Sequence, residues 1–279
     1  MTVRRFNGEY VAVAPLYDRT PEEVQARDRR QGQPLHRWIV WDAATAVAAV
    51  STWRRPDDRL FLYFVGDAGS VGRLTATAIG ELGRPVHTMA DPAEAAMFDA
   101  LRRAGFATEM VAERFAVRFT RALDRLRRAW TPTGYSVISA ADADHDALFE
   151  LDNLIRRDTP GTGGWVGDRA WFAEELAESP PFDPATYLVG VDPTGSYAGL
   201  VRIWRNPAGP RFGLIGVAPP HRSTSLGAAL IRQGLEAASG WGYDYFVTET
   251  SLTNRVMHPR LARLADERLG VFHQLIRRP

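Results

Sequence analysis

The sequence contains no cysteine and no lysine. Without cysteine, the chain can form no disulfide, no thiolate nucleophile and no cysteine zinc site. Without lysine, it has no side-chain amine for a Schiff base or for proton abstraction. Its six histidines show no spacing typical of metal ligands, so we expect no bound metal.

The chain also lacks a large net charge and long apolar runs; its formal net charge is +1. Its 34 basic residues nearly balance its 33 acidic ones, so no charge excess attracts nucleic acid or an anionic membrane. No apolar run reaches the roughly 20 residues that a membrane helix needs, and the first residues show no apolar segment with a cleavage site. We therefore expect a cytoplasmic protein without membrane or nucleic-acid partners. A Rossmann glycine fingerprint, a Walker loop and a G-x-S-x-G turn are also missing.

Two stretches of the chain resemble each other. WRRPDDRLFLYFVGDAG (53–69) and WRNPAGPRFGLIGVAPP (204–220) each predict a strand ending in Trp-Arg, a proline turn and a second apolar strand. Further on, segments 95–117 and 255–276 each carry apolar residues at i, i+4 and i+7, which predicts one helix face followed by a strand. The chain therefore reads as two copies of one α/β unit.

The repeat sets the expected domains and fold class. The basic segment RALDRLRRAWTPTG (121–134) ends in proline and glycine and is the expected joint. We expect an N-terminal domain over 1–122, a linker over 123–134 and a C-terminal domain over 135–279. Each domain is expected to be a mixed, mostly antiparallel sheet flanked by helices, in an α/β (α+β) class.

The stretch GLIGVAPPHRSTSLGAALI (213–231) predicts a buried strand, a Pro-Pro stop, a basic loop and a helix from about Ser225. A helix N-terminus offers unpaired amides and a partial positive charge, so it binds phosphate groups. Arg222 would add a charge-assisted hydrogen bond, and small residues let the backbone approach the ligand. A surface ion pair is the alternative for Arg222. The pattern favours a pyrophosphate ligand.

GVAPPHRSTSLGAAL resembles the acyl-CoA loop of the GNAT N-acetyltransferase superfamily, with Val217, Pro219, Arg222 and Gly227 at the pattern's positions. TNRVMHPRLARLAD resembles the Asn-containing helix that follows in that family. The element order fits nearly all of 135–279, so the chain looks like a tandem GNAT protein. The resemblance implies acetyl-CoA as co-substrate and the following contacts to it: Ile215, Val217, Arg222, Ser223, Thr224, Ser225, Leu226, Gly227, Ala228 and Asn254.

Three departures from the family pattern stand in the C-terminal half. Ser225 replaces the usual first loop glycine, Leu261 occupies the place of a tyrosine general acid, and Ala265-Asp266 replaces Gly-Phe. The N-terminal loop VGDAGSVGRLTA lacks the prolines and the arginine. We therefore interpret the N-terminal copy as structural, a working acyl-CoA site being the alternative.

Glu249 in YFVTETS is the candidate general base, because an alkylammonium must lose a proton before it attacks a thioester. A strand-end acid facing solvent is its alternative reading. With leucine at 261, Tyr245 or water is expected to protonate the leaving thiolate. Asp158, Trp165 and Trp204 are candidate acceptor contacts, with surface exposure or core packing as the alternative.

The resemblance thus implies direct acyl transfer from acyl-CoA, with acetyl-CoA as the expected donor, to the amine of a small molecule or an amino-acid-like acceptor in a ternary complex. We expect a monomer or a homodimer. The alternative is a weak or inactive protein that binds acyl-CoA or a metabolite without turnover.

Overall fold

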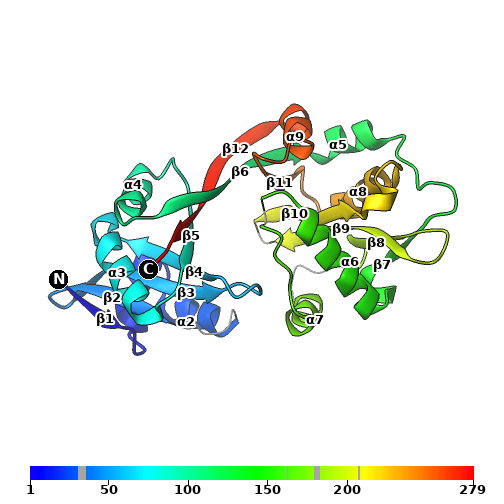
Figure 1. Cartoon of the computed structure of the whole chain (residues 1–279). Helices are drawn as coiled ribbons and strands as arrows, with labels where there is room; N and C mark the ends of the chain where they lie inside the picture. Colours follow the sequence, from blue (N-terminus) through cyan, green and yellow to red (C-terminus); the bar gives the residue numbers. More distant parts are fainter. Residues whose placement is uncertain (31–35, 162, 179–182, 207) are drawn as a thin grey trace. The chain divides into compact units, whose positions relative to one another are not determined.

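The computed structural model describes residues 1–30, 36–161, 163–178, 183–206 and 208–279. The chain forms two compact units, here called unit 1 (Met1–Val111 with Val271–Pro279) and unit 2 (Ala112–Gly270) (Figure 1). In the described part of the chain, no helix combines the length and apolarity needed to cross a membrane.

Unit 1 contains a mixed sheet in the order β1-β2-β3-β4-β5-β12, antiparallel except for the parallel pair β4 and β5, with an apolar cluster on each face. Its strands are β1 (Thr2–Arg5), β2 (Arg37–Asp42), β3 (Thr45–Arg54), β4 (Leu60–Gly66), β5 (Val86–Ala90) and the end of β12 (Glu267–Arg277). Its helices are α1 (Tyr10–Val13), α2 (Pro21–Arg30), α3 (Val71–Leu82) and α4 (Ala95–Arg103).

The core of unit 1 follows from strand alternation and helix periodicity. Trp38, Val50 and Leu62 on neighbouring strands are buried against Leu74 of α3 and Leu101 of α4. Apolar residues two apart on a strand share a face, and those four apart on a helix share a stripe. The predicted apolar face of segment 95–117 is therefore a real core-facing stripe.

Unit 2 has the strand order β6-β11-β10-β9-β8-β7, antiparallel except for the parallel pair β10 and β11. Its strands are the second half of β6 (Ala107–Arg118), β7 (Ser136–Ser139), β8 (Tyr187–Val191), β9 (Tyr197–Asn206), β10 (Gly209–Val217) and β11 (Tyr245–Ser251). Its helices are α5 (Phe119–Leu126), α6 (His145–Asp158), α7 (Arg169–Glu178), α8 (Leu226–Ser239) and α9 (Met257–Leu264).

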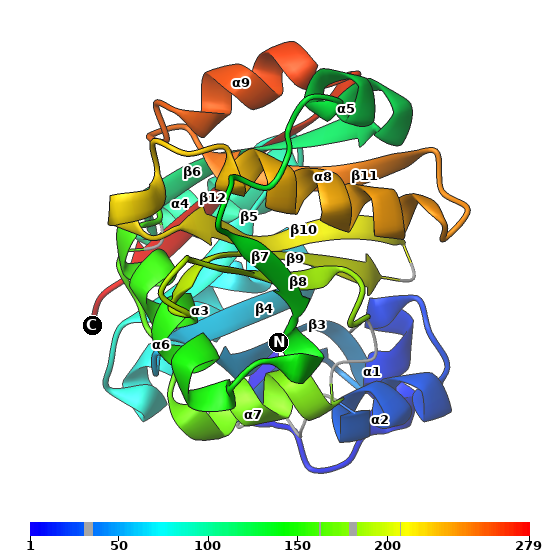
Figure 2. The same ribbon diagram turned by 90° about the vertical axis from the view of Figure 1, so that its right-hand side faces the viewer.

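The sheet of unit 2 is covered on both faces. One face carries Phe115, Phe212 and Phe246 and packs with side chains of α5, α8 and α9. We call it the α8/α9 face. The other carries Leu200 and Leu214 and packs with α6 and α7; we call it the α6/α7 face. Figure 2 shows α8 running along the strands of this unit.

The mixed α/β architecture and the internal repeat predicted from the sequence are confirmed. The two similar stretches form matching antiparallel hairpins, β3–β4 and β9–β10. Each hairpin leads into a helix, α3 or α8, and each later apolar helix, α4 or α9, leads into a long strand, β6 or β12.

The domain boundaries differ from those expected, because the two halves exchange their long strands. Residues 112–118 of β6 pair with β11 in unit 2, and residues 273–277 of β12 pair with β5 in unit 1. Helix α5 begins within the expected N-terminal domain and ends within the expected linker, and it packs on α8 in unit 2. The apolar pattern of a strand shows which of its faces is buried, but not which neighbouring strand it pairs with. The sequence therefore does not predict which sheet each long strand joins.

The exchange predicts how fragments of the chain behave. Residues 130–279 lack the β6 segment that pairs with β11, so the edge of β11 is left open and its apolar neighbours lose their cover. Residues 112–270 keep that segment. We expect fragment 130–279 to be less soluble and to melt at a lower temperature than fragment 112–270, as measured by soluble yield and circular dichroism. Equal melting of the two fragments would contradict the role given to β6.

Candidate active site

The central feature of unit 2 is the point where two parallel strands part. In the described chain, β10 and β11 are in register at one residue pair, Arg211 with Val247. Past Phe212 the register of β10 against β9 shifts, which marks a bulge before Ile215. Residues 214–217 of β10 and 248–251 of β11 thus run on without pairing to each other. Ligands of open α/β sheets bind where strands part at their carboxyl ends.

Close backbone contacts hold the end of β10 in place. A Cβ on Gly216 would lie 2.4 Å from Ile155 Cγ2 of α6, and one on Gly213 would lie 2.5 Å from the Trp204 indole nitrogen. Side chains at these positions are excluded by contact distance, so the glycines let α6 and Trp204 approach the strand.

The predicted strand, loop and helix lie where expected. β10 ends at Val217, a short 3-10 turn covers Pro219–His221, and α8 begins at Leu226. Ser225 does not cap α8 with its side chain; its hydroxyl donates instead to the Trp130 carbonyl at 2.9 Å. The N-cap side chain therefore does not bond the α8 amides, and helix-start amides without such a bond can bind an anion.

Members of the expected acyl-CoA set differ in exposure. Arg222, Ser223 and Ser225 are exposed, and Ile215, Val217, Thr224, Gly227, Ala228 and Asn254 are half-buried. Leu226 is fully buried, and its amide donates to the Thr224 hydroxyl at 3.2 Å. Asn254 uses its side-chain oxygen to accept the amide of Met257 at the start of α9, 3.0 Å away.

Arg222 brings together two further predicted residues. Its Nε donates to the carbonyl of Val217 at 3.0 Å, and its guanidinium pairs with the carboxylate of Asp158 at the end of α6. Both charged side chains are about half exposed. The ion pair considered as an alternative for Arg222 is therefore present in this structure, and it lies directly beside the carboxyl end of β10.

Glu249 lies on β11 two residues past the register pair. Its carboxylate accepts from Arg211 of β10 at 2.5 Å and from Arg114 of β6 at 3.4 Å. Its side chain is 25 % exposed, so it is enclosed rather than facing bulk solvent. Sequence reasoning missed both arginines, because their contacts depend on strand register.

Tyr245 lies at the opposite end of β11. It pairs across the sheet with Arg118, two residues before the register pair, and its side chain is half exposed. Tyr245 therefore precedes the segment of β11 that diverges from β10.

The predicted aromatic contacts surround the α6/α7 face. Trp165 packs edge-on against Trp171 with ring centres 5.5 Å apart, and the Arg156 guanidinium lies 4.4 Å from the centre of the Trp165 ring. Arg156 also pairs with buried Asp152 one helical turn earlier. Trp204 lies across from Arg211 in the β9–β10 register, with Arg202 stacked on its ring at 4.6 Å.

Asp266, one of the two residues that replace the family's Gly-Phe, has a structural role. Its carboxylate accepts the backbone amide of Arg118 at 2.9 Å, and that hydrogen bond lowers the pKa of Asp266, with the charges of Arg121 and Arg118 adding to it. A charged residue at this position ties the segment after α9 to the end of β6.

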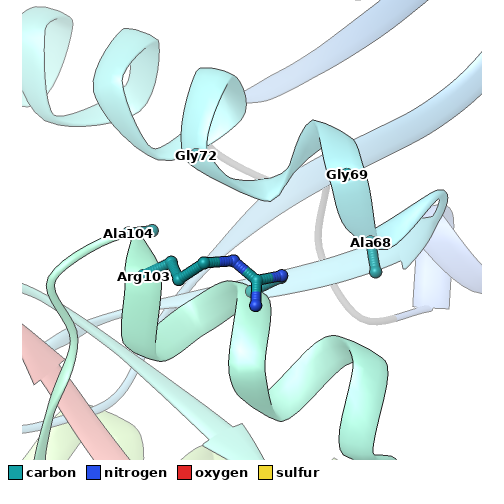
Figure 3. Close-up of a pocket in the computed structure, with 6 residues that line it drawn as sticks. Ala68, Gly69, Gly72, Arg103 and Ala104 are labelled. Atoms are coloured by element: carbon teal, nitrogen blue, oxygen red, sulfur yellow. The ribbon is translucent and has the colours of Figure 1, made fainter.

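Unit 1 has a pocket at the equivalent helix start. Its lining residues include Ala68, Gly69 and Gly72, with the Arg103 side chain of α4 extending across it (Figure 3). The Asp67 carboxylate accepts from the Gly69 amide at 3.1 Å, so an acid lies in the loop where unit 2 has Arg222. In the described residues, no group of three or more potential metal ligands is found in either unit.

Residues 148–265 match the model of the acetyltransferase (GNAT) family, so this part of the chain is a GNAT domain. The whole chain has the tandem GNAT fold. It is similar to a GCN5-related N-acetyltransferase from Sphaerobacter thermophilus, with TM-score 0.69 and 17 % identity over 100 % of this chain and 96 % of that one. It is also similar to a tandem GNAT protein from the clavulanic acid biosynthesis pathway, with TM-score 0.67 and 14 % identity over 99 % and 98 %.

Curated relatives match a shorter stretch. A mycothiol acetyltransferase of Salinispora tropica is 34 % identical over 98 residues, and one of Salinispora arenicola is 32 % identical over 97. In both cases the match covers 33 % of this chain and 31 % of the relative.

The close approach of α6 to β10 generates a stability prediction. Gly216→Ala would press a Cβ against Ile155, and overpacking of this kind costs about 1–3 kcal/mol. Gly240→Ala is the control, because a Cβ there would lie 3.4 Å from the Ala237 carbonyl oxygen, and it should be near neutral. Urea unfolding midpoints measure both, and equal midpoints would refute the proposed close packing.

Proposed function

We propose that unit 2 is an acyl-CoA-dependent N-acyltransferase, with acetyl-CoA as donor and the amine of a small molecule as acceptor. The observation that carries the proposal is the parting of β10 from β11 directly before a basic loop and an uncapped helix start. The GNAT match covers all of these elements. From the curated relatives we carry over acetyl transfer as the reaction class.

The donor's place follows from hydrogen-bonding groups. The pyrophosphate would accept from the amides at the start of α8, around Gly227 and Ala228, and from Arg222. The pantetheine arm carries amides and would lie along the unpaired end of β10 as an added strand. The thioester carbonyl would then accept from the backbone at Val217, where charge develops during attack.

The acceptor would approach from the α6/α7 face. Glu249, Arg211 and Trp204 share this face of the sheet by register, and Asp158 lies at the end of α6. We propose that Glu249 takes the proton of the acceptor's ammonium group through a water molecule, because arginines already contact both of its carboxylate oxygens. Asp158, Trp165 and Trp204 remain proposed acceptor contacts.

Binding without turnover is the second candidate. Glu249 is held by two arginines, and Leu261 occupies the position of the family's general acid. Release of free CoA thiol from acetyl-CoA, measured with a panel of amines, distinguishes the two. Thiol release that depends on the amine supports transfer, whereas tight acetyl-CoA binding without release supports the second candidate. We propose that unit 1 has a structural role and that the protein is a monomer or homodimer.

One prediction of this proposal concerns donor binding. Arg222→Ala should weaken acetyl-CoA binding by about 10- to 100-fold, which corresponds to about 1.5–3 kcal/mol for a hydrogen bond to a charged group. Asp158→Asn is the matched control, because it removes the competing carboxylate and should leave affinity equal or slightly higher. Calorimetric titration measures both. Unchanged affinity in Arg222→Ala would place the pyrophosphate elsewhere.

Another prediction of this proposal concerns Glu249. Glu249→Gln should keep acetyl-CoA affinity and lower kcat by about 10²- to 10⁴-fold, the usual effect of removing a positioned base. The loss should shrink towards high pH, where more of the acceptor amine is already neutral. Turnover from pH 6 to 10 tests this. Parallel pH profiles with similar rates would show that Glu249 only pairs with its arginines.

A further inference from the structure

A histidine and a glutamate form a partly buried pair on the α8/α9 face. The Nε2 atom of His258, in the first turn of α9, lies 2.7 Å from a carboxylate oxygen of Glu113 on β6. Glu113 is 7 % exposed in its side chain and His258 is 24 % exposed. The other Glu113 oxygen accepts from Arg268 at 3.2 Å. A carboxylate this buried is expected to hold its partner in a defined position.

The pair lies beside the diverging strand. Glu113 is opposite Thr250 on β11, and the His258 ring packs against Phe115, which is opposite Thr248. Both positions belong to the segment of β11 that follows the register pair and has no β10 partner. The figures agree in drawing α9 beside β6 and β11 (Figures 1 and 2).

Its position on α9 is also informative. His258 and Leu261 are three residues apart in the helix, so their side chains are neighbours on one face. Leu261 packs on the apolar cluster that includes Ile215 and Val217 at the end of β10. His258 therefore lies one turn before the leucine that replaces the family's acid, on the side of α9 that contacts Glu113 and Phe115 of the sheet.

We propose that His258 is the general acid of unit 2 and that Glu113 is its positioning residue. This inference rests on the proposed acyltransferase function. Glu113 accepts the Nε2 hydrogen and so leaves Nδ1 as the atom that exchanges a proton. Among the described residues, Nδ1 has no hydrogen-bond partner.

The proposed step balances as follows. The neutral amine attacks the thioester carbonyl carbon, a C–N bond forms and the C–S bond breaks. The CoA thiolate takes the Nδ1 proton of the imidazolium, and the amine's surplus proton leaves on the Glu249 side. The transfer neutralises the imidazolium, and CoA leaves as the free thiol. His258 then recovers a proton from solvent, to which it is partly exposed.

The arrangement separates the two proton transfers by the sheet. Residues 248 and 250 of β11 share a face with Glu113 and Phe115, whereas Glu249 faces the opposite side with Arg114. Glu249 and the His258–Glu113 pair would thus lie on opposite faces of the sheet, both beside residues 248–250 of β11. In the proposed mechanism, one proton leaves on the acceptor side and another enters on the sulfur side.

The test uses the full-length chain, acetyl-CoA and the best amine of the panel. His258→Gln should keep acetyl-CoA affinity within about twofold and lower kcat by about 10²-fold. The wild-type rate should fall at high pH as the acid loses its proton, and this alkaline decline should disappear in His258→Gln. Glu113→Gln should keep the decline but lower kcat, and imidazole added to His258→Ala should restore part of the rate.

Arg268→Gln is the matched control, because it breaks the other contact to Glu113 without touching His258. It should leave the pH profile unchanged. If wild-type protein is active and His258→Gln matches it in kcat and alkaline decline, the role of His258 is refuted while the acyltransferase proposal stands. If wild-type protein transfers no acyl group to any amine, both fail. Should His258→Gln not fold, the Glu113→Gln and imidazole arms decide.

Discussion

The parting of β10 from β11 is the constraint on which unit 2 depends. Parallel strands normally continue as evenly spaced hydrogen-bonded neighbours, and here the register holds at a single described pair. The register of β10 against β9 shifts before Ile215, and glycines at 213 and 216 let Trp204 and α6 approach the strand. What remains is an end of β10 whose backbone groups have no partner on β11. Such groups need hydrogen-bond partners, which a pantetheine chain carries.

The alternation of side chains along β11 and β6 places the charged groups near this point on two opposite faces of the sheet. On β11, Glu249 faces Arg211 and Arg114, while its neighbours at 248 and 250 face the side of Glu113 and His258. Each enclosed acid has cationic or imidazole partners, as an acid shielded from water requires. The same alternation that builds the two apolar faces therefore also places a carboxylate on one face and an imidazole on the other, beside one short strand.

The sequence predicted the elements of unit 2 and the strand-loop-helix at 213–231, because turn residues and apolar periodicity are local signals. It also predicted the repeat, whose hairpins recur at β3–β4 and β9–β10. It did not predict the exchange of β6 and β12, nor the partners of Glu249 and His258. Arg114 lies 135 residues from Glu249, and Glu113 lies 145 residues from His258. Pairings over such distances depend on strand register, which a single sequence does not specify.

The Arg222–Asp158 ion pair is compatible with the proposed phosphate-binding role of Arg222, because the pair is weak enough to be exchanged. Both side chains are about half exposed, and exposed ion pairs of this kind contribute only about 0–1 kcal/mol. Under the proposed function, a phosphate would contact Arg222 together with the α8 amides and would take the place of the carboxylate. The hydrogen bond from Arg222 to the Val217 carbonyl uses Nε, which leaves the terminal nitrogens for the exchange. In this proposal the Asp158 carboxylate, at the end of α6, then becomes available to contact the acceptor.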